Sequence, residues 1–130
     1  MTRIPLFAAS CLMAAFLAVP ASAQDQVTVP LPDVSGLSQD EAERLIAALA
    51  QINVITSNCP GYEITDGEWT LLTGTGDRLA AQLGLDPTTY EQRYYGPAFE
   101  LLDDPEACER IGPRARPVIE DLVKMGGATE

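Results

Sequence analysis

The sequence predicts a small all-α domain: a bundle of four to five helices, held by one disulfide and preceded by an extended N-terminal arm. Helix-start patterns recur along the chain, at Ser38, Thr65, Asp86 and Asp104. Apolar residues then repeat every three or four positions, which is the spacing of one helix face. Beyond the apolar N-terminus the chain keeps two cysteines, enough for one covalent bond between distant segments.

Residues 1–23 are typical of a signal peptide. Arg3 precedes an apolar run over 6–19, and small residues lead up to a cleavage site after Ala23. The alternative of a membrane anchor needs about 20 apolar residues, more than this run supplies. A second alternative is a lipoprotein attached through Cys11, but the residues before Cys11 match the lipidation pattern poorly. We therefore expect an exported protein, located in the periplasm, with secretion from the cell as the alternative.

The charge and composition exclude several function classes. The chain has 8 basic and 19 acidic residues, a net charge of −11, and no histidine. An acidic surface repels phosphate and anionic lipid, so we expect no nucleic-acid partner, and no membrane span after signal cleavage. Without histidine the chain lacks the commonest general base and the usual zinc ligand. The prediction is a non-enzymatic protein with no cofactor and no metal.

The first helix is predicted from its capping residues. Residues 24–36 are rich in proline, which cannot donate to a helix or sheet, so they predict an extended, mobile arm. The helical domain is predicted over 37–125. Ser38 and Glu41 form a capping box, and the helix should end near Cys59 because a proline follows. Its expected apolar face comprises Ala42, Leu45, Leu49 and Ile52.

A second capping box, Thr65 with Glu68, predicts a helix that ends at Gly84. Glycines in its middle indicate either that a neighbour approaches closely or that the helix is broken. Trp69 begins the apolar face and is predicted to lie in the core. The members of that face are Trp69, Leu72, Gly76, Leu79 and Leu83.

Acidic residues gather at the start of this second helix: Glu63, Asp66 and Glu68. The helix dipole favours negative charge at this position and explains them. A cation site or a carboxylate pair for glycoside hydrolysis is the alternative.

The C-terminal half predicts further helical segments. Asp86 caps a helix whose first residue is a proline, and Gly96-Pro97 should kink it. Asp104-Pro105 repeats the start pattern. Gly112-Pro113 and Pro117 should break the last region at least once before it ends near position 124. Residues 126–130 are predicted to be a C-terminal tail.

Exported proteins with two remaining cysteines most often pair them, so we expect a bond between Cys59 and Cys108. Closing a loop of this length stabilises the fold by about 4 kcal/mol. Most aromatic residues lie between the two cysteines, and they are interpreted either as core or as a groove that binds a peptide or small ligand. The candidates are Tyr62, Trp69, Tyr90, Tyr94, Tyr95 and Phe99. Because Tyr94 and Tyr95 are adjacent, one of them should reach the surface.

Two resemblances bear on these expectations. The segment 27–42 is similar to the opening of a PASTA domain, but that family continues with a three-stranded sheet and this chain with helix patterns, so we take the match as chance. From Asn58 onward the chain resembles small exported helical proteins of unknown function from α-proteobacteria, through Asn58-Cys59-Pro60, Leu83-Gly84-Leu85-Asp86, Asp104-Pro105-Glu106-Ala107-Cys108 and Ile111-Gly112. That resemblance implies a helical fold and a Cys59–Cys108 bond, and no activity. Single-disulfide acid-stress chaperones have a similar cysteine separation without further motifs.

The function expected from the sequence is contact with a protein partner that the sequence does not identify. The alternatives are a binding module with an aromatic groove, or a chaperone whose packing loosens as its carboxylates are neutralised in acid. A deep pocket lined by Trp69 and tyrosines would favour the binding module. A flat apolar patch would favour protein contacts.

Overall fold

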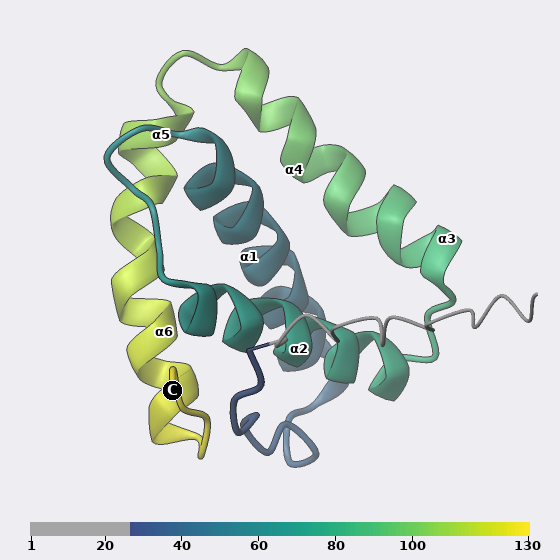
Figure 1. Ribbon diagram of the computed structural model, residues 1–130. Coiled ribbons are helices and arrows are strands. Elements are labelled where there is room, and N and C mark those ends of the chain that lie inside the picture. Colours follow the sequence, from purple (N-terminus) through teal and green to yellow (C-terminus); the bar gives the residue numbers. More distant parts are fainter. Residues whose placement is uncertain (1–26) are drawn as a thin grey trace, which may run out of the picture.

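A computed structural model describes residues 27–130; the predicted signal peptide, its cleavage site and Cys11 lie outside the described residues. Every regular element in 27–130 is helical, which confirms the all-α prediction. The sheet of a PASTA domain is therefore absent from this part of the chain. The elements form four helical units (Figure 1): α1 Gln39–Asn58; α2 Asp66–Gln82; α3 Pro87–Tyr90, η1 Glu91–Tyr95, α4 Gly96–Glu100 and η2 Leu101–Asp103; α5 Ala107–Ile111, η3 Gly112–Arg114 and α6 Ala115–Lys124.

Helix α1 is the centre of the fold. It lies between α6 and the α3–α4 segment, and α2 packs across it (Figure 1). The predicted capping box starts it: Ser38 Oγ accepts the Glu41 N–H at 3.2 Å, and Glu41 Oε2 accepts the Ser38 N–H at 2.8 Å. Its last turns contain β-branched residues of low helix propensity, including Ile52, Val54 and Ile55, and all three are buried. Burial of their side chains outweighs the weak propensity.

The core is shared among all four units. The buried apolar residues of the main cluster come from α1, α2, α5 and α6, together with Cys59 at the end of α1 and Val34 of the N-terminal arm. A smaller cluster of Ala50, Val54 and Ala98 joins α1 to α4, and Tyr94 and Tyr95 pack against it. The small alanines on both sides let the two helices lie close together.

Residues 87–103 form one continuous helical segment, which we call the rod. Its predicted kink at Gly96-Pro97 takes the form of a widened π-helical turn over Glu91–Tyr95. Gly96 donates its N–H to the carbonyl of Glu91, five residues back. Pro97 has no N–H to offer and its ring crowds the preceding turn, so the wider turn accommodates it without ending the helix.

Helix α2 is unbroken, and each of its two central glycines has a close neighbour. Of the two sequence interpretations, a close neighbour or a broken helix, the first is therefore confirmed. A Cβ at Gly76 would lie 2.5 Å from the hydroxyl oxygen of Tyr90, and one at Gly74 would lie 2.8 Å from a methyl group of Leu31. The neighbour at Gly76 is therefore the rod, and the neighbour at Gly74 is the arm.

The predicted disulfide is present. Cys59, the C-cap of α1, is bonded to Cys108 in α5, and their Cα atoms are 5.7 Å apart. The bond ties the first helical unit to the last. The last unit breaks once, at Gly112-Pro113, where the chain forms the short 3₁₀ turn η3. Pro117 lies in the first turn of α6, where backbone N–H groups have no helical partner, and causes no second break.

The arm (residues 27–36) and the tail (residues 126–130) pack on the domain side by side. Asp33 donates its N–H to the carbonyl of Met125 at 3.2 Å, and Ala128 donates to the carbonyl of Pro30 at 3.0 Å. Gly126 turns the chain back after α6 with a φ of +104°, a conformation that glycine adopts without strain. The described part of the predicted arm is extended, as expected. Its Pro32 and Val34 side chains are buried against the domain rather than free in solvent.

Candidate functional site

The six aromatic candidates lie in three separate places. Tyr90, Tyr94, Tyr95 and Phe99 follow one another along the rod, where ring contacts connect them. Tyr62 packs beside the disulfide, and Trp69 lies at the start of α2. In residues 27–130 no ring contact connects Tyr62 or Trp69 to the rod. The predicted aromatic set is therefore one cluster of four and two single residues.

Tyr90 and Tyr95 form the inner part of the rod cluster. Their ring centroids are 5.3 Å apart in an edge-to-face arrangement. The Tyr90 hydroxyl lies over Gly76, and burial, with the neighbouring Tyr95, raises the pKa of Tyr90 far above its ordinary value. Tyr95 Oη accepts the side-chain N–H of Asn53 at 3.0 Å, which holds the ring against α1. These hydroxyls serve packing and orientation, and Tyr90 stays protonated at physiological pH.

Tyr94 and Tyr95 are both half-buried, so the two do not divide into one core residue and one surface residue. Tyr94 faces the first turns of α1 beside Arg44, and Tyr95 faces Asn53. The most exposed aromatic residue of the rod is Phe99, with 49% of its surface accessible, and Leu102, one turn later, is 39% exposed. We call Tyr95, Phe99 and Leu102 the outer stripe.

The prediction that Trp69 lies in the core is wrong: 47% of its surface is exposed. Leu72, Gly76 and Leu79 of the predicted face are buried. The buried face also includes Glu68, Leu71 and Thr75, and it leaves Trp69 outside. Two of these buried residues are polar, and a pattern of apolar residues cannot place them. Thr75 is satisfied by the carbonyl of Leu71, at 2.6 Å from its Oγ1.

Tyr62 covers the backbone of the last helical unit. A Cβ at Gly112 would lie 2.5 Å from the ring carbon Cγ of Tyr62, so the ring rests directly on this glycine. Tyr62 follows Cys59 by three residues and Gly112 follows Cys108 by four, so the contact supports the same junction as the disulfide. Its geometry indicates a structural role.

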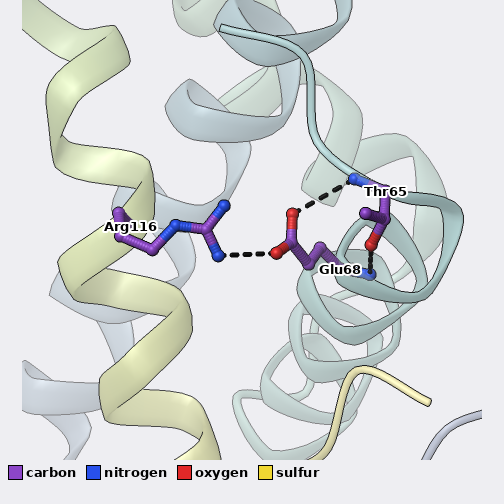
Figure 2. A network of polar contacts seen from close by, with 3 residues as sticks. All are labelled: Thr65, Glu68 and Arg116. Carbon is purple, nitrogen blue, oxygen red and sulfur yellow. Dashed lines mark hydrogen bonds and ion pairs between the residues drawn. The ribbon is translucent and has the colours of Figure 1, made fainter.

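Glu68 makes polar contacts with Thr65 at the start of its own helix and with Arg116 of α6 (Figure 2). Its Oε1 accepts a hydrogen bond from Arg116 Nη1 at 2.6 Å, and its Oε2 accepts the N–H of Thr65 at 3.1 Å. Thr65 Oγ1 accepts the Glu68 N–H in return, which completes the predicted capping box. The hydrogen bond from Arg116 holds the pKa of Glu68 below its usual range, against the opposing effect of burial. One carboxylate therefore caps α2 and fastens α6 to it.

The acidic residues at the start of α2 do not form a shared site. Glu68 is turned toward Arg116, and Glu63 Oε2 accepts the N–H of Gly61 at 2.9 Å. Asp66 instead borders a surface depression beside Trp69. Within residues 27–130 no group of three His, Cys, Asp or Glu side chains is placed to hold a metal ion. The geometry favours the interpretation that these acids serve the helix end.

The surface has shallow depressions open to solvent. One of about 430 Å³ is lined by Val27, Asp66, Trp69 and Thr70. Another of about 420 Å³ lies between α2 and α6 and is lined by Glu68, Arg116, Ile119, Glu120, Val123, Lys124 and Thr129. A third, beside α1, includes Tyr94 but no other aromatic residue. None of these three brings Trp69 together with a tyrosine, as the aromatic-groove interpretation required.

Sequence reasoning missed one feature of this surface and left the orientation of a second open. Arg116 was not connected with Glu68, because 48 residues separate them and no short pattern marks the pair. The outer stripe was visible as a 95–99–102 spacing, but only the structure shows which way this face of the rod points.

Comparisons of the chain with protein-family models, curated proteins and solved structures find no match. Among the described residues, no helix is both long enough and apolar enough to span a membrane.

Proposed function

We propose that this is a small exported, non-enzymatic protein that acts by contacting another protein. The observation that carries the proposal is the outer stripe, because Phe99 and Leu102 expose large apolar side chains one turn apart on the rod. Exposed apolar side chains that adjoin one another mark contact surfaces more often than scattered ones. The disulfide supports the assignment to an oxidising compartment outside the cytoplasm.

The shape of the surface favours this function over a ligand-binding module. Small-molecule sites are concave and bury most of their ligand. The depression at Trp69 is shallow and open, and the rod tyrosines are engaged with α1 and α2. Phe99 and Leu102 line none of the three depressions described above, so a second macromolecule is the occupant that can cover them.

The test is affinity capture with the mature chain immobilised and an envelope extract of the source organism. The parent protein is compared with the Phe99→Ser/Leu102→Ser double variant, and with Val123→Ser, which removes an exposed apolar side chain from α6. We expect a defined set of proteins to bind the parent and Val123→Ser, and to be lost from the double variant. Circular dichroism melting confirms that each variant is folded. Equal capture by all three proteins would refute the assignment of the contact surface.

A further inference from the structure

We infer that the outer stripe docks a cationic amphipathic helix, a segment with apolar residues on one face and lysine or arginine beside them. This inference rests on the proposed contact function and specifies the chemistry of the partner. It follows from the spacing of the stripe, from the charges around it, and from the occupants that those charges exclude.

The spacing of the stripe is that of a helix-packing seam. Tyr95, Phe99 and Leu102 are separated by four and then three residues, as are successive core positions of a coiled coil. The ring centroids of Tyr95 and Phe99 are 6.5 Å apart, so the side chains lie on one face. The seam deepens from exposed Leu102 to half-buried Tyr95, which the Asn53 hydrogen bond fixes in place. A partner helix with apolar residues at the same spacing can interleave with it.

Acidic residues border this seam. Glu91 lies one turn before Tyr95, Asp103 lies one turn after Phe99, and Glu100 follows Phe99 directly; all three carboxylates are exposed. None of them forms an ion pair within residues 27–130. Over positions 87–106 the chain has one basic residue, Arg93, against five acidic ones. A partner with lysine or arginine beside its apolar face would neutralise these carboxylates as the apolar groups meet.

The same charges exclude other occupants. A second copy of this chain would place its own carboxylates against these ones, and like charges across an interface oppose binding. An anionic lipid surface is repelled for the same reason. A stable complex buries roughly 800 Å² of surface on each partner. Three side chains offer much less surface than that, so the contact should be weak and readily reversible.

The experiment uses two synthetic helical peptides of about 20 residues, long enough to form helix. Both have leucine at the seam positions; one has lysine at the flanking positions and the other has glutamate. Fluorescence anisotropy of the labelled peptides is measured against the mature protein at about 0.15 M salt, where long-range charge effects are screened. We expect the lysine peptide to bind with a Kd of about 10–100 µM, and the glutamate peptide to bind at least tenfold more weakly.

Variants localise the binding to the stripe. Phe99→Ser/Leu102→Ser should weaken binding of the lysine peptide at least tenfold. Glu91→Gln/Glu100→Gln/Asp103→Asn should weaken it about fivefold to tenfold and reduce its salt dependence. The matched control neutralises three exposed acids on and beyond α6, Glu120→Gln/Asp121→Asn/Glu130→Gln, and should change the Kd by less than twofold.

Three outcomes would overturn the inference: no binding of the lysine peptide, equal binding of the glutamate peptide, or an equal loss in the α6 control. The last would mean that net charge alone attracts the peptide. None of these outcomes decides the result of the capture experiment. A protein that binds the parent but not the Phe99→Ser/Leu102→Ser variant would still establish contact through the stripe. The two proposals therefore fail separately.

Discussion

Replacing Glu68 with glutamine tests whether this carboxylate holds α2 and α6 together. The Glu68 side chain is 10% exposed and accepts hydrogen bonds from Arg116 and from the Thr65 backbone. Glutamine keeps the size and one acceptor oxygen for Thr65, but loses the charge that Arg116 requires. A charge-assisted hydrogen bond contributes about 1.5–3 kcal/mol. Because the Arg116 side chain is 58% exposed and water can replace its partner, we expect a loss of about 1–2 kcal/mol.

The assay is thermal melting at pH 7 of the parent, Glu68→Gln, Arg116→Gln and the double variant. A loss of this size corresponds to a melting temperature lower by about 4–10 °C in a domain of this length. The double-mutant cycle isolates the coupling between the two side chains, which should be about 1 kcal/mol. A coupling below about 0.3 kcal/mol would show that the pair is incidental and that capping alone accounts for Glu68.

The pH dependence of the same variants gives a second readout. Arg116 lowers the pKa of Glu68 in the folded protein below the ordinary value of 4.5. A carboxyl group with a lowered pKa stabilises the fold at pH values above its unfolded pKa, and this contribution is lost as the pH falls through the folded pKa. The stability difference between the parent and Glu68→Gln should therefore be constant from about pH 5 to 8 and shrink below about pH 4. A difference that disappeared between pH 6 and 8 would contradict the assignment to Glu68.

The remaining predictions concern the disulfide and two aromatic contacts. Cys59→Ser should lower the melting temperature by about 10 °C or more, since closing the loop contributes about 4 kcal/mol; an unchanged melt would refute this. Gly112→Ala should cost about 1–3 kcal/mol in chemical denaturation, because the added Cβ meets the Tyr62 ring, and Tyr62→Ala should remove most of that cost. Trp69→Ala should cost only about 1 kcal/mol, and the single tryptophan should be readily quenched by acrylamide; strong shielding would contradict its exposed position.

Three helix starts were predictable because local chemistry sets them, whereas the start predicted at Asp104 is wrong, since α5 begins at Ala107. Ser38 and Thr65 each bond the backbone three residues ahead, and Asp86 does the same before Pro87, so short patterns were sufficient. The pairing of Cys59 with Cys108 followed from their number and context. The helix starts depend on residues that are neighbours in sequence. The disulfide depends on two cysteines that have only each other as a partner.

The exposure of Trp69 was not predictable in the same way, although Leu72, Gly76 and Leu79 of the predicted α2 face are buried as expected. The apolar pattern pointed to Trp69, whereas the fold buries Glu68 and Thr75 because each finds a hydrogen-bond partner. For Glu68 that partner is Arg116, in another helical unit. Burying a polar group is costly only when it is left unpaired, so the rotation of a helix can depend on a partner that the local sequence does not reveal. The six aromatic candidates separate into three places because they belong to the loop before α2, to α2 and to the rod.

The packing of the arm against the tail shows the limit most clearly. The arm has apolar side chains that pack on the core, among them Val29, Leu31 and Val34. The bonds that join it to the C-terminal segment, from Asp33 to Met125 and from Ala128 to Pro30, are backbone hydrogen bonds, which residue types hardly influence. What selects the arrangement is the shape of the surface beneath: Gly127 lies where a Cβ would meet Leu71 at 2.7 Å, so only a glycine admits the tail at this depth. Met125, the residue just before the tail, accepts the Asp33 N–H, and Ala128 in the tail donates to Pro30, so the two ends of the domain dock together. The arm is thus held beside α2 in part by residues nearly one hundred positions away. Its first described residue, Val27, lines the depression at Trp69.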